Sequence, residues 1–404
     1  MKTIFKSTIF LFSLIGSLNF FAQTSAETQE ELMKLKLPHG IPPAPNAASL
    51  GKCGDIPVSE FTGSASVSLP LYNIGVGSLN LPLMANYHSG GIKVEEIASD
   101  LGLGWALTTG GVISKTIRGV DDFLPDGYLY NNAENAQKVR KFANGEMTAS
   151  EAQDFQFSVA KGYLDTEPDQ FTFNFSNFSG KFVYNSNFEI VVHPYENLKI
   201  LATPSGFEIT APDGIKYIFE DVETTYVISK TQKNGTINPY IDGYQYTSSW
   251  YLSKIITPGG EEVNYTYFSL KIQPEYIASE AKYFRYHVNT PLNCSPTQPF
   301  EKEFTILNWQ ETETFQKKIS KITFPNGEIN FTYKESGRID LPGDRALDKI
   351  IISNKAGVLK SFNFGQNYFN NRLYLTSVVE EGQGESKPPY KFEYYTPGFI
   401  NKTS

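Results

Sequence analysis

A turn motif recurs along the second half of this chain and limits the folds that the chain can adopt. It combines proline and glycine at three places, which are Pro212-Asp213-Gly214, Pro258-Gly259-Gly260 and Pro325-Asn326-Gly327. Proline presets φ at the second position of a turn, and glycine permits a positive φ beyond it. Turns of this kind between apolar segments are typical of β-hairpins.

Each of these turns is followed by a strand pattern with one aliphatic and two aromatic residues at two-residue spacing. The three sets are Ile215, Tyr217 and Phe219; Val263, Tyr265 and Tyr267; and Ile329, Phe331 and Tyr333. The segments before two of the turns are also alike, namely Leu252-Ser253-Lys254-Ile255 and Ile319-Ser320-Lys321-Ile322. Because the spacing slips between copies, the pattern predicts a degenerate array of β-hairpins rather than a strict solenoid.

The rest of the chain adds strands and one helical stretch. Alternation over residues 64–71 and 79–87 predicts strands, and Pro70 and Pro82 place them at sheet edges or beside bulges. Helical spacing appears over residues 131–160, where Thr148 and Glu151 fit a capping box. We therefore predict a mainly β fold of antiparallel hairpins and sandwich-like sheets, with a small helical insertion around 131–160.

The N-terminus has the order of a secretory signal peptide. Lys2 and Lys6 precede an apolar run over residues 9–18, and small residues follow it. We expect cleavage within residues 22–26, so that the mature chain begins between Gln23 and Glu27, and we expect export and a location outside the cell or on its surface. No later window approaches 18 continuous apolar residues, so we expect no transmembrane segment in the mature chain.

The same reading divides the chain into five parts. They are a signal peptide (1–26), a proline-rich leader (27–50), an N-terminal β region (51–130), the helical insertion (131–160) and a β-hairpin repeat region (161–404).

Composition excludes several classes of protein. Aromatic residues make up 14% of the chain, which supplies ample apolar surface to bury and argues against disorder. The 32 glycines and 23 prolines argue against a coiled coil. The formal net charge of −8 argues against nucleic-acid binding, which needs a basic face.

Motifs in the first third of the chain support a family resemblance. They include Phe61-Thr62-Gly63, Leu101-Gly102-Leu103-Gly104-Trp105, Gly110-Gly111-Val112-Ile113 and Arg118-Gly119. Later segments agree, among them Ser249-Trp250-Tyr251-Leu252 and Arg372-Leu373-Tyr374-Leu375. Over most of residues 45–395 the chain resembles the N-terminal region of Rhs/YD-repeat proteins and, more distantly, the B-component shell of insecticidal toxin complexes.

The chain also departs from that family. Rhs arrays carry a Tyr-Asp dipeptide followed by a Gly-Arg turn, and this chain has no Tyr-Asp. Its nearest approach is Tyr333-Lys334-Glu335-Ser336-Gly337-Arg338. The long repeat array, the self-cleaving segment and the variable C-terminal toxin of the family are missing. The resemblance therefore implies a truncated or remnant form of a polymorphic toxin-like protein.

One tryptophan and two acidic sets invite a binding role. Trp105 could be a platform for a sugar or a partner, but we favour a buried core anchor beside a tight glycine turn. Asp165, Glu167 and Asp169 could hold Ca²⁺, but no EF-hand glycine or distal glutamate follows, so we favour a solvated acidic turn. For a further acidic set, Asp121, Asp122 and Asp126, we likewise favour a solvated acidic turn over a Ca²⁺ site.

Other chemistry-bearing residues lack the required spacing. The four histidines are dispersed as His39, His88, His193 and His287. Cys53 and Cys294 could form a bridge after export, although two free or buried thiols are favoured. Glu95 and Glu96 are adjacent, so on a strand they point to opposite faces. The run Tyr283-Phe284-Arg285-Tyr286 could bind glycan, although sheet packing explains it better. We expect no catalytic, cofactor-binding or metal-binding residues.

Three functions remain in order of preference. The first is an exported, non-catalytic β scaffold that joins other protein segments through exposed strand edges. One such edge is expected near residues 387–395, where Tyr390, Phe392 and Tyr394 alternate after Pro388 and Pro389. The second is a cell-surface adhesin or a module that binds surface glycans. A glycoside hydrolase is a distant third, and we expect that the chain is not an enzyme.

Overall fold

The computed structural model describes residues 66–88, 96–233, 236–238, 243–284, 303–382 and 384–394. Strands make up 59% of the structure, so the predicted mainly β fold is confirmed. Within the described residues there are two helices, α4 (Tyr130–Ala143) and α5 (Ala149–Ala160). The signal peptide, the leader, both cysteines, His39, His287 and Glu95 lie outside the described residues, as do Arg285 and Tyr286.

A small antiparallel sheet begins the described chain. It consists of β1 (Ser66–Val76), β2 (Leu79–His88) and β3 (Trp105–Thr108), in that order. The register of β1 against β2 shifts between Pro70 and Tyr72, so Pro70 lies beside a bulge, which is one of the two placements expected for it. Pro82 pairs with Asn73 of β1 and lies beyond the stretch of β2 that pairs with β3. Both prolines therefore lie where a missing backbone N–H is tolerated.

The second sheet is much larger and opens with short strands. These are β4 (Gly111–Thr116), β5 (Gln170–Phe175), β6 (Phe178–Tyr184), β7 (Ile190–His193), β8 (Lys199–Ala202) and β9 (Phe207–Thr210). Consecutive members pair antiparallel from β4 to β7 and again from β8 to β9.

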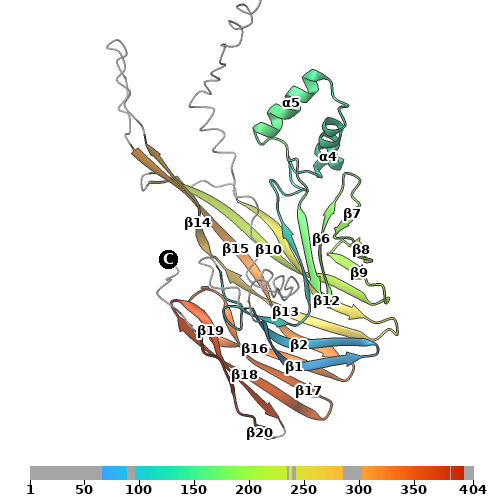
Figure 1. Ribbon diagram of the computed structural model, residues 1–404, viewed down its shortest axis with the longest axis vertical. Coiled ribbons are helices and arrows are strands. Elements are labelled where there is room, and N and C mark those ends of the chain that lie inside the picture. Colours follow the sequence, from blue (N-terminus) through green and yellow to red (C-terminus); the bar gives the residue numbers. More distant parts are fainter. Residues whose placement is uncertain are drawn as a thin grey trace, which may run out of the picture.

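Long strands follow and run obliquely between the short strands and the C-terminal hairpins (Figure 1). They are β10 (Lys216–Lys233), β12 (Tyr244–Ile256), β13 (Glu262–Ile272), β14 (Glu275–Phe284) and β15 (Glu303–Phe324), with the short β11 (Thr236–Asn238) beside β10. Strands β12 and β15 both pair with β10 and with β13. The four strands therefore close a circuit of antiparallel pairing.

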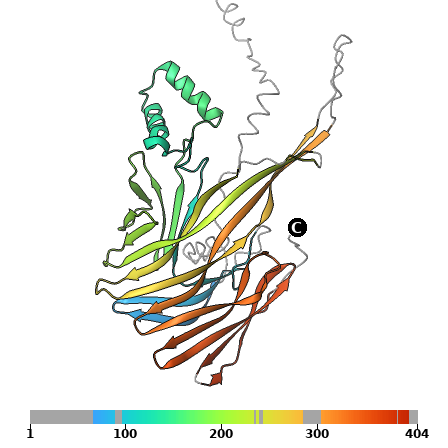
Figure 2. The same ribbon diagram turned by 180° about the vertical axis from the view of Figure 1, so that it is seen from behind.

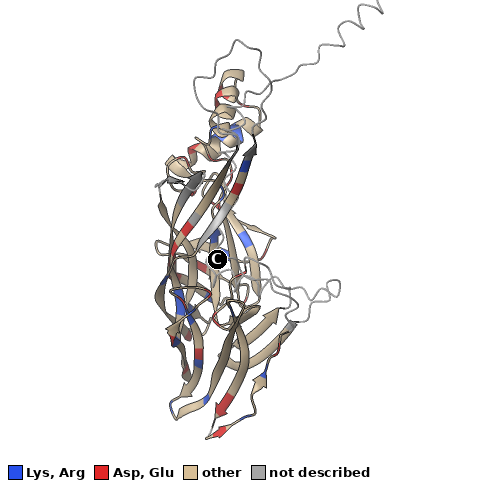
Figure 3. Ribbon diagram, turned by 90° about the vertical axis from the view of Figure 1, so that its left-hand side faces the viewer, with Lys and Arg blue, Asp and Glu red and all other residues tan. Residues whose placement is uncertain are grey.

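Hairpins complete the sheet at the C-terminal end. They comprise β16 (Gly327–Gly337), β17 (Arg345–Asn354), β18 (Gly357–Phe369), β19 (Arg372–Gly382), β20 (Glu385–Ser386) and β21 (Tyr390–Lys391). Seen from behind, these strands lie next to β1 and β2, so segments far apart in sequence are neighbours (Figure 2). Acidic and basic residues are interspersed along the strands (Figure 3).

The predicted hairpin repeat is present in space. Gly214 and Gly260 adopt positive φ of 83° and 87° at their turns, as the turn motif requires. All three strands after these turns direct the predicted residues into the main core. Ile215, Tyr217, Phe219, Val263, Tyr265, Ile329 and Phe331 are buried there, and Tyr267 and Tyr333 pack against it.

Two copies of the repeat also share their polar contacts. The hydroxyl of Tyr267 donates to the carbonyl of Leu252 at 2.8 Å, and that of Tyr333 donates to the carbonyl of Ile319 at 3.0 Å. The ion pairs between Lys254 and Glu262 (3.1 Å) and between Lys321 and Glu328 (2.6 Å) are likewise equivalent. The similarity of the two segments in sequence therefore reflects one repeated hairpin geometry.

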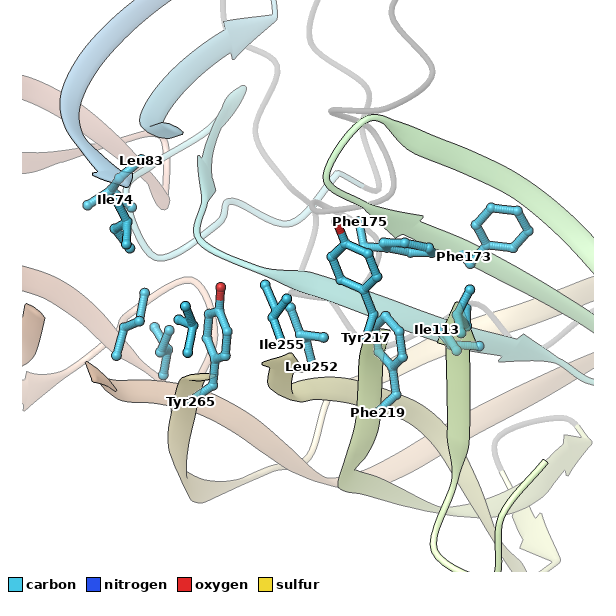
Figure 4. Packing of buried hydrophobic residues seen from close by; sticks show 14 of the residues in the cluster. Ile74, Leu83, Ile113, Phe173, Phe175, Tyr217, Phe219, Leu252, Ile255 and Tyr265 are labelled. Carbon is cyan, nitrogen blue, oxygen red and sulfur yellow. The ribbon is translucent and has the colours of Figure 1, made fainter. Parts of the chain in front are cut away.

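The core is rich in aromatic side chains (Figure 4). Phe173 and Phe175 of β5 lie beside Tyr217 and Phe219 of β10 in this view. Phe175 is 4.7 Å from Tyr217 and 5.4 Å from Phe219, measured between ring centroids. Tilted and edge-on arrangements of this kind are the ones that aromatic quadrupoles favour.

Helices α4 and α5 form a projection that we call the helical arm, residues 130–160 (Figures 1 and 2). The predicted capping box is present, because Thr148 accepts from the amide of Glu151 while Glu151 accepts from the amide of Thr148. Gly145 separates the helices at φ +68°. Neither helix of the described chain has the length and apolar character needed to cross a bilayer.

Candidate functional site

Residues 96–105, which we call the strap, run between the small sheet and the C-terminal hairpins. The strap contains the Gly-Leu-Gly-Trp motif. Gly102 adopts φ +140°, and a Cβ atom there would lie 2.5 Å from the backbone nitrogen of Leu375. The amide of Leu103 donates to the carbonyl of Leu373 at 2.8 Å. Glycine is therefore required because the strap backbone lies directly against β19.

The strap backbone is also held by side chains. Gln366 Nε2 of β18 donates to the carbonyl of Asp100 at 3.1 Å and to that of Leu347 at 3.0 Å. Arg338 donates from Nη2 to the carbonyl of Ala98 at 2.9 Å and from Nη1 to that of Ser99 at 3.2 Å. The carbonyl groups of this irregular segment are thereby satisfied, as burial requires.

Five charged side chains form a buried network around the strap. Lys318 of β15 is fully buried, pairs with Asp344 at 2.6 Å and contacts the carboxylate of Asp100. Arg338 pairs with Asp340 at 2.7 Å and with Asp344 at 2.8 Å. Although burial opposes its charge, these aspartates raise the pKa of Arg338 above its ordinary value. We call Lys318, Arg338, Asp100, Asp340 and Asp344 the strap network.

A small cavity of about 60 Å³ adjoins the strap network. Its lining includes Asp100, Lys317 and three tyrosines, Tyr251, Tyr267 and Tyr333. The tyrosine hydroxyls donate to Glu223, to the carbonyl of Leu252 and to the carbonyl of Ile319. The cavity has room for only a few water molecules, and its hydroxyl groups already bond to the protein.

Glu223 lies where β10 passes between β12 and β15, and its side chain is completely buried. The carboxylate accepts from Ser248 Oγ and from Tyr251 Oη, each at 3.1 Å, and from the backbone amide of Lys317 at 3.3 Å. Burial raises the pKa of Glu223 to about 7, although these hydrogen bonds oppose the rise.

Trp105 is 3% exposed, which agrees with a core anchor and not with a surface platform. Its Nε1 donates to the hydroxyl of Tyr394 at 2.8 Å, and that hydroxyl donates to the carbonyl of Leu375 at 2.6 Å. The ring also packs edge-on against Phe392, with centroids 4.7 Å apart.

The expected open strand near residues 387–395 is therefore largely folded back. Tyr390 is half exposed, but the rings of Phe392 and Tyr394 turn inward onto Trp105 and Tyr374. The amide of Phe392 donates to the carbonyl of Thr376 at 2.9 Å. What remains as the last strand is the two-residue β21, which pairs with β19.

The prediction of solvated acidic turns was wrong for four of the six aspartates and glutamates concerned. Asp121, Asp122, Asp165 and Asp169 are 6%, 0%, 9% and 0% exposed. They are buried because Lys115 and several backbone amides compensate their charge. Of these residues only Glu167 and Asp126 are exposed. The described residues contain no group of carboxylates, histidines or cysteines arranged to hold a metal ion.

The sequence did not predict the strap network, although one of its five residues belongs to a motif noted in the sequence. Arg338 belongs to the Gly337-Arg338 dipeptide, the chain's nearest approach to the Rhs repeat. Lys318 follows another lysine and gives no signal of burial. Nothing local marks either as the partner of a segment more than two hundred residues earlier.

No family model and no curated protein matches the sequence. Solved structures are similar at the level of the chain trace. A crystal structure of TcdB2-TccC3-Cdc42 matches with 12% identity and a TM-score of 0.36, over 82% of this chain and 16% of that chain. The Photorhabdus luminescens Tc holotoxin pore with a TccC3 mutation gives 11% identity, a TM-score of 0.36 and the same coverage of 82% and 16%.

The N-terminal domain of the effector SpvB from Salmonella typhimurium is also similar. It matches with 11% identity and a TM-score of 0.34, over 79% of this chain and 99% of that domain. This chain spans only about 16% of the length of the toxin chains. Values this low do not assign a shared function.

Proposed function

We propose that this chain is an exported, non-catalytic β scaffold, related to the N-terminal portion of Rhs/YD-repeat proteins, that joins further protein segments through its strand edges. The observation that carries the proposal is the strap network. Its buried charges are directed at one another and at the carbonyls of Ala98 and Ser99, so they tie distant segments together.

Two further features support a structural role. Equivalent hairpins repeat the same tyrosine-to-carbonyl hydrogen bond, which links the two paired strands of each hairpin. The motif that carries the resemblance to Rhs/YD-repeat proteins, residues 101–105, is used to seat the strap against β19. In both features, residues of a recognisable sequence motif make packing contacts.

The edge for a partner segment is the outer side of β21. Tyr390 is 50% exposed and Lys391 is also exposed, whereas the inner side of this strand pairs with β19. An unpaired edge can accept another strand, although Pro388 and Pro389 before β21 and the charge of Lys391 blunt part of this one. The expected partner is an extended segment that adds to this edge.

Light scattering coupled to size-exclusion chromatography tests the proposal. The mature chain, the chain lacking residues 387–404 and a Tyr390→Lys variant would be compared. The scaffold predicts self-association of the mature chain that both changes reduce. Monomers in all three, together with hydrolysis of a polysaccharide panel, would overturn the proposal in favour of an enzyme. Monomers that bind a glycan array would favour the adhesin instead.

A further inference from the structure

The helical arm is attached to the sheet through two stems. Residues 117–129 lead from β4 into α4, and residues 161–169 lead from α5 into β5. At the base of the arm Ala133 and Ala136 are buried, whereas α5 has no buried residue. The arm projects past the end of the sheet in both views (Figures 1 and 2). Its position therefore depends on how the stems are held together.

Aspartate side chains join one stem to the other. Asp169 accepts from the backbone amides of Arg118 and Asp122, each at 3.0 Å. Asp122 returns the contact by accepting from the amide of Asp169 at 3.0 Å. Asp165 accepts from the amide of Val120 at 3.2 Å. Each of these bonds crosses between the stems.

We call this group the acid clasp, and it consists of Asp121, Asp122, Asp165, Asp169 and Lys115. Lys115 Nζ lies 2.5 Å from Asp121 and 3.2 Å from Asp169. Lys115 thus pairs with two of the four carboxyl groups, and Asp122 and Asp165 have no ion pair with it. Asp122 is 0% exposed, and its Oδ2 is buried without a hydrogen-bond partner among the described atoms. An ionised carboxylate in that position is not compensated, and a buried group of this kind takes up a proton instead.

Lys115 is the cation whose charge acts on Asp122 and Asp169. Three tyrosines from the first stem, β6 and β12 feel its negative charge, namely Tyr128, Tyr184 and Tyr244. Arg118 pairs outward with the exposed Glu167 at 3.1 Å. Burial, and then the charge of Asp169, raise the pKa of Asp122 to about 8. Burial raises that of Asp165 to about 6.

We propose that the acid clasp is a proton-dependent latch for the helical arm. With Asp122 in its neutral form the stems are held together, and loss of that proton loosens them and frees the arm. The closed clasp retains a proton that separated stems release. The equilibrium constant for opening therefore rises about tenfold per pH unit between the ordinary pKa of an aspartate and the raised pKa of Asp122 in the closed clasp. Above that raised pKa the constant no longer changes with pH.

Hydrogen exchange on the mature chain measures this opening directly. Protection of the amides of Arg118, Val120, Asp122 and Asp169, corrected for intrinsic exchange, would be followed from pH 6 to 9. We expect a fall of about a hundredfold from pH 6 to 8 and a plateau above. Asp122→Asn keeps an acceptor for the Asp169 amide without charge, so its protection should stay high and flat.

Glu223→Gln is the matched control, because Glu223 is a buried carboxyl group whose pKa is also raised by burial, and it lies in β10, outside the stems. In this variant the protection of the stem amides should depend on pH as it does in the wild type. Stem protection independent of pH in the wild type would overturn the proposal, and that measurement needs no variant. The proposal would also be overturned if protection in Asp122→Asn fell with pH as steeply as in the wild type. The same holds if protection of the stem amides were lost together with protection of the β15 amides.

Discussion

The guanidinium group of Arg338 donates to the carbonyl of Ala98 at 2.9 Å, across 240 positions of sequence. The same side chain pairs with Asp340 and Asp344. A buried arginine thus fixes an irregular segment against the hairpins, because its planar fork can bond carboxylates and carbonyls at once. The strap network is therefore the point where the N-terminal and C-terminal parts of the described chain become one structure.

Lys318→Met should destabilise the protein strongly. The change removes the buried partner of Asp100 and Asp344 and leaves both carboxylates without that charge. Breaking one side of a buried ion pair costs about 3–5 kcal/mol. The free energy of unfolding in urea measures the loss. Lys321→Met is the control, because its pair with Glu328 is exposed and a surface pair contributes about 0–1 kcal/mol. Equal losses in the two variants would contradict a structural role for the strap network.

Gly102→Ala should also be destabilising. A methyl group there meets the Leu375 backbone at 2.5 Å, and φ of +140° disfavours any L side chain. Strain of this kind costs about 1–3 kcal/mol before the steric overlap is added. Thermal unfolding compares the variant with Gly75→Ala, where nothing lies within 4 Å of the new Cβ. If Gly102→Ala unfolds at the wild-type temperature, the strap does not lie against β19 as described.

Trp105→Ala should lower the free energy of unfolding by about 3–5 kcal/mol, the usual cost of removing a buried indole. Trp105→Phe retains an aromatic ring for Phe392 but loses the Nε1 hydrogen bond to Tyr394, so its loss should be smaller. Chemical denaturation of both variants gives the comparison. An unchanged midpoint for Trp105→Ala would instead favour the surface-platform interpretation.

Glu223→Gln should change how stability depends on pH. The pKa of Glu223 is raised to about 7 in the fold, so the folded state retains a proton that the unfolded chain releases. Stability from this group is present at low pH and falls as the pH rises from about 4.5 to 7, by about 1.4 kcal/mol per pH unit. The glutamine variant should lack this slope and be the more stable protein at pH 8. Urea titrations at pH 5 and 8 test it, and an identical pH dependence in both proteins would reject the assignment.

Local sequence predicted much of the secondary structure for identifiable reasons. Proline and glycine at the turns constrain φ directly, so the hairpins at Gly214 and Gly260 follow from residue type. The capping box at Thr148 is satisfied within one turn of helix, so it is also readable locally. Burial of Trp105 was favoured because a large ring beside glycines usually packs inward.

The acidic residues were misjudged because charge alone predicts exposure. Asp122 and Asp169 are buried because each accepts the other's backbone amide, and this arrangement exists only once β4 and β5 are paired. Lys115 supplies the compensating charge from within a strand. Asp122 and Asp169 are 47 positions apart, so no local pattern shows that they meet.

The sequence by itself determined the β-hairpin character of this protein, its turn positions and its helical insertion. Those features depend on backbone preferences and on side-chain alternation over a few residues. Tertiary structure alone decided which charged residues would be buried, since Lys318 and Asp100 meet across 218 positions. A buried charge is tolerated only where the fold supplies its partner, and that partner is set by the pairing of distant strands.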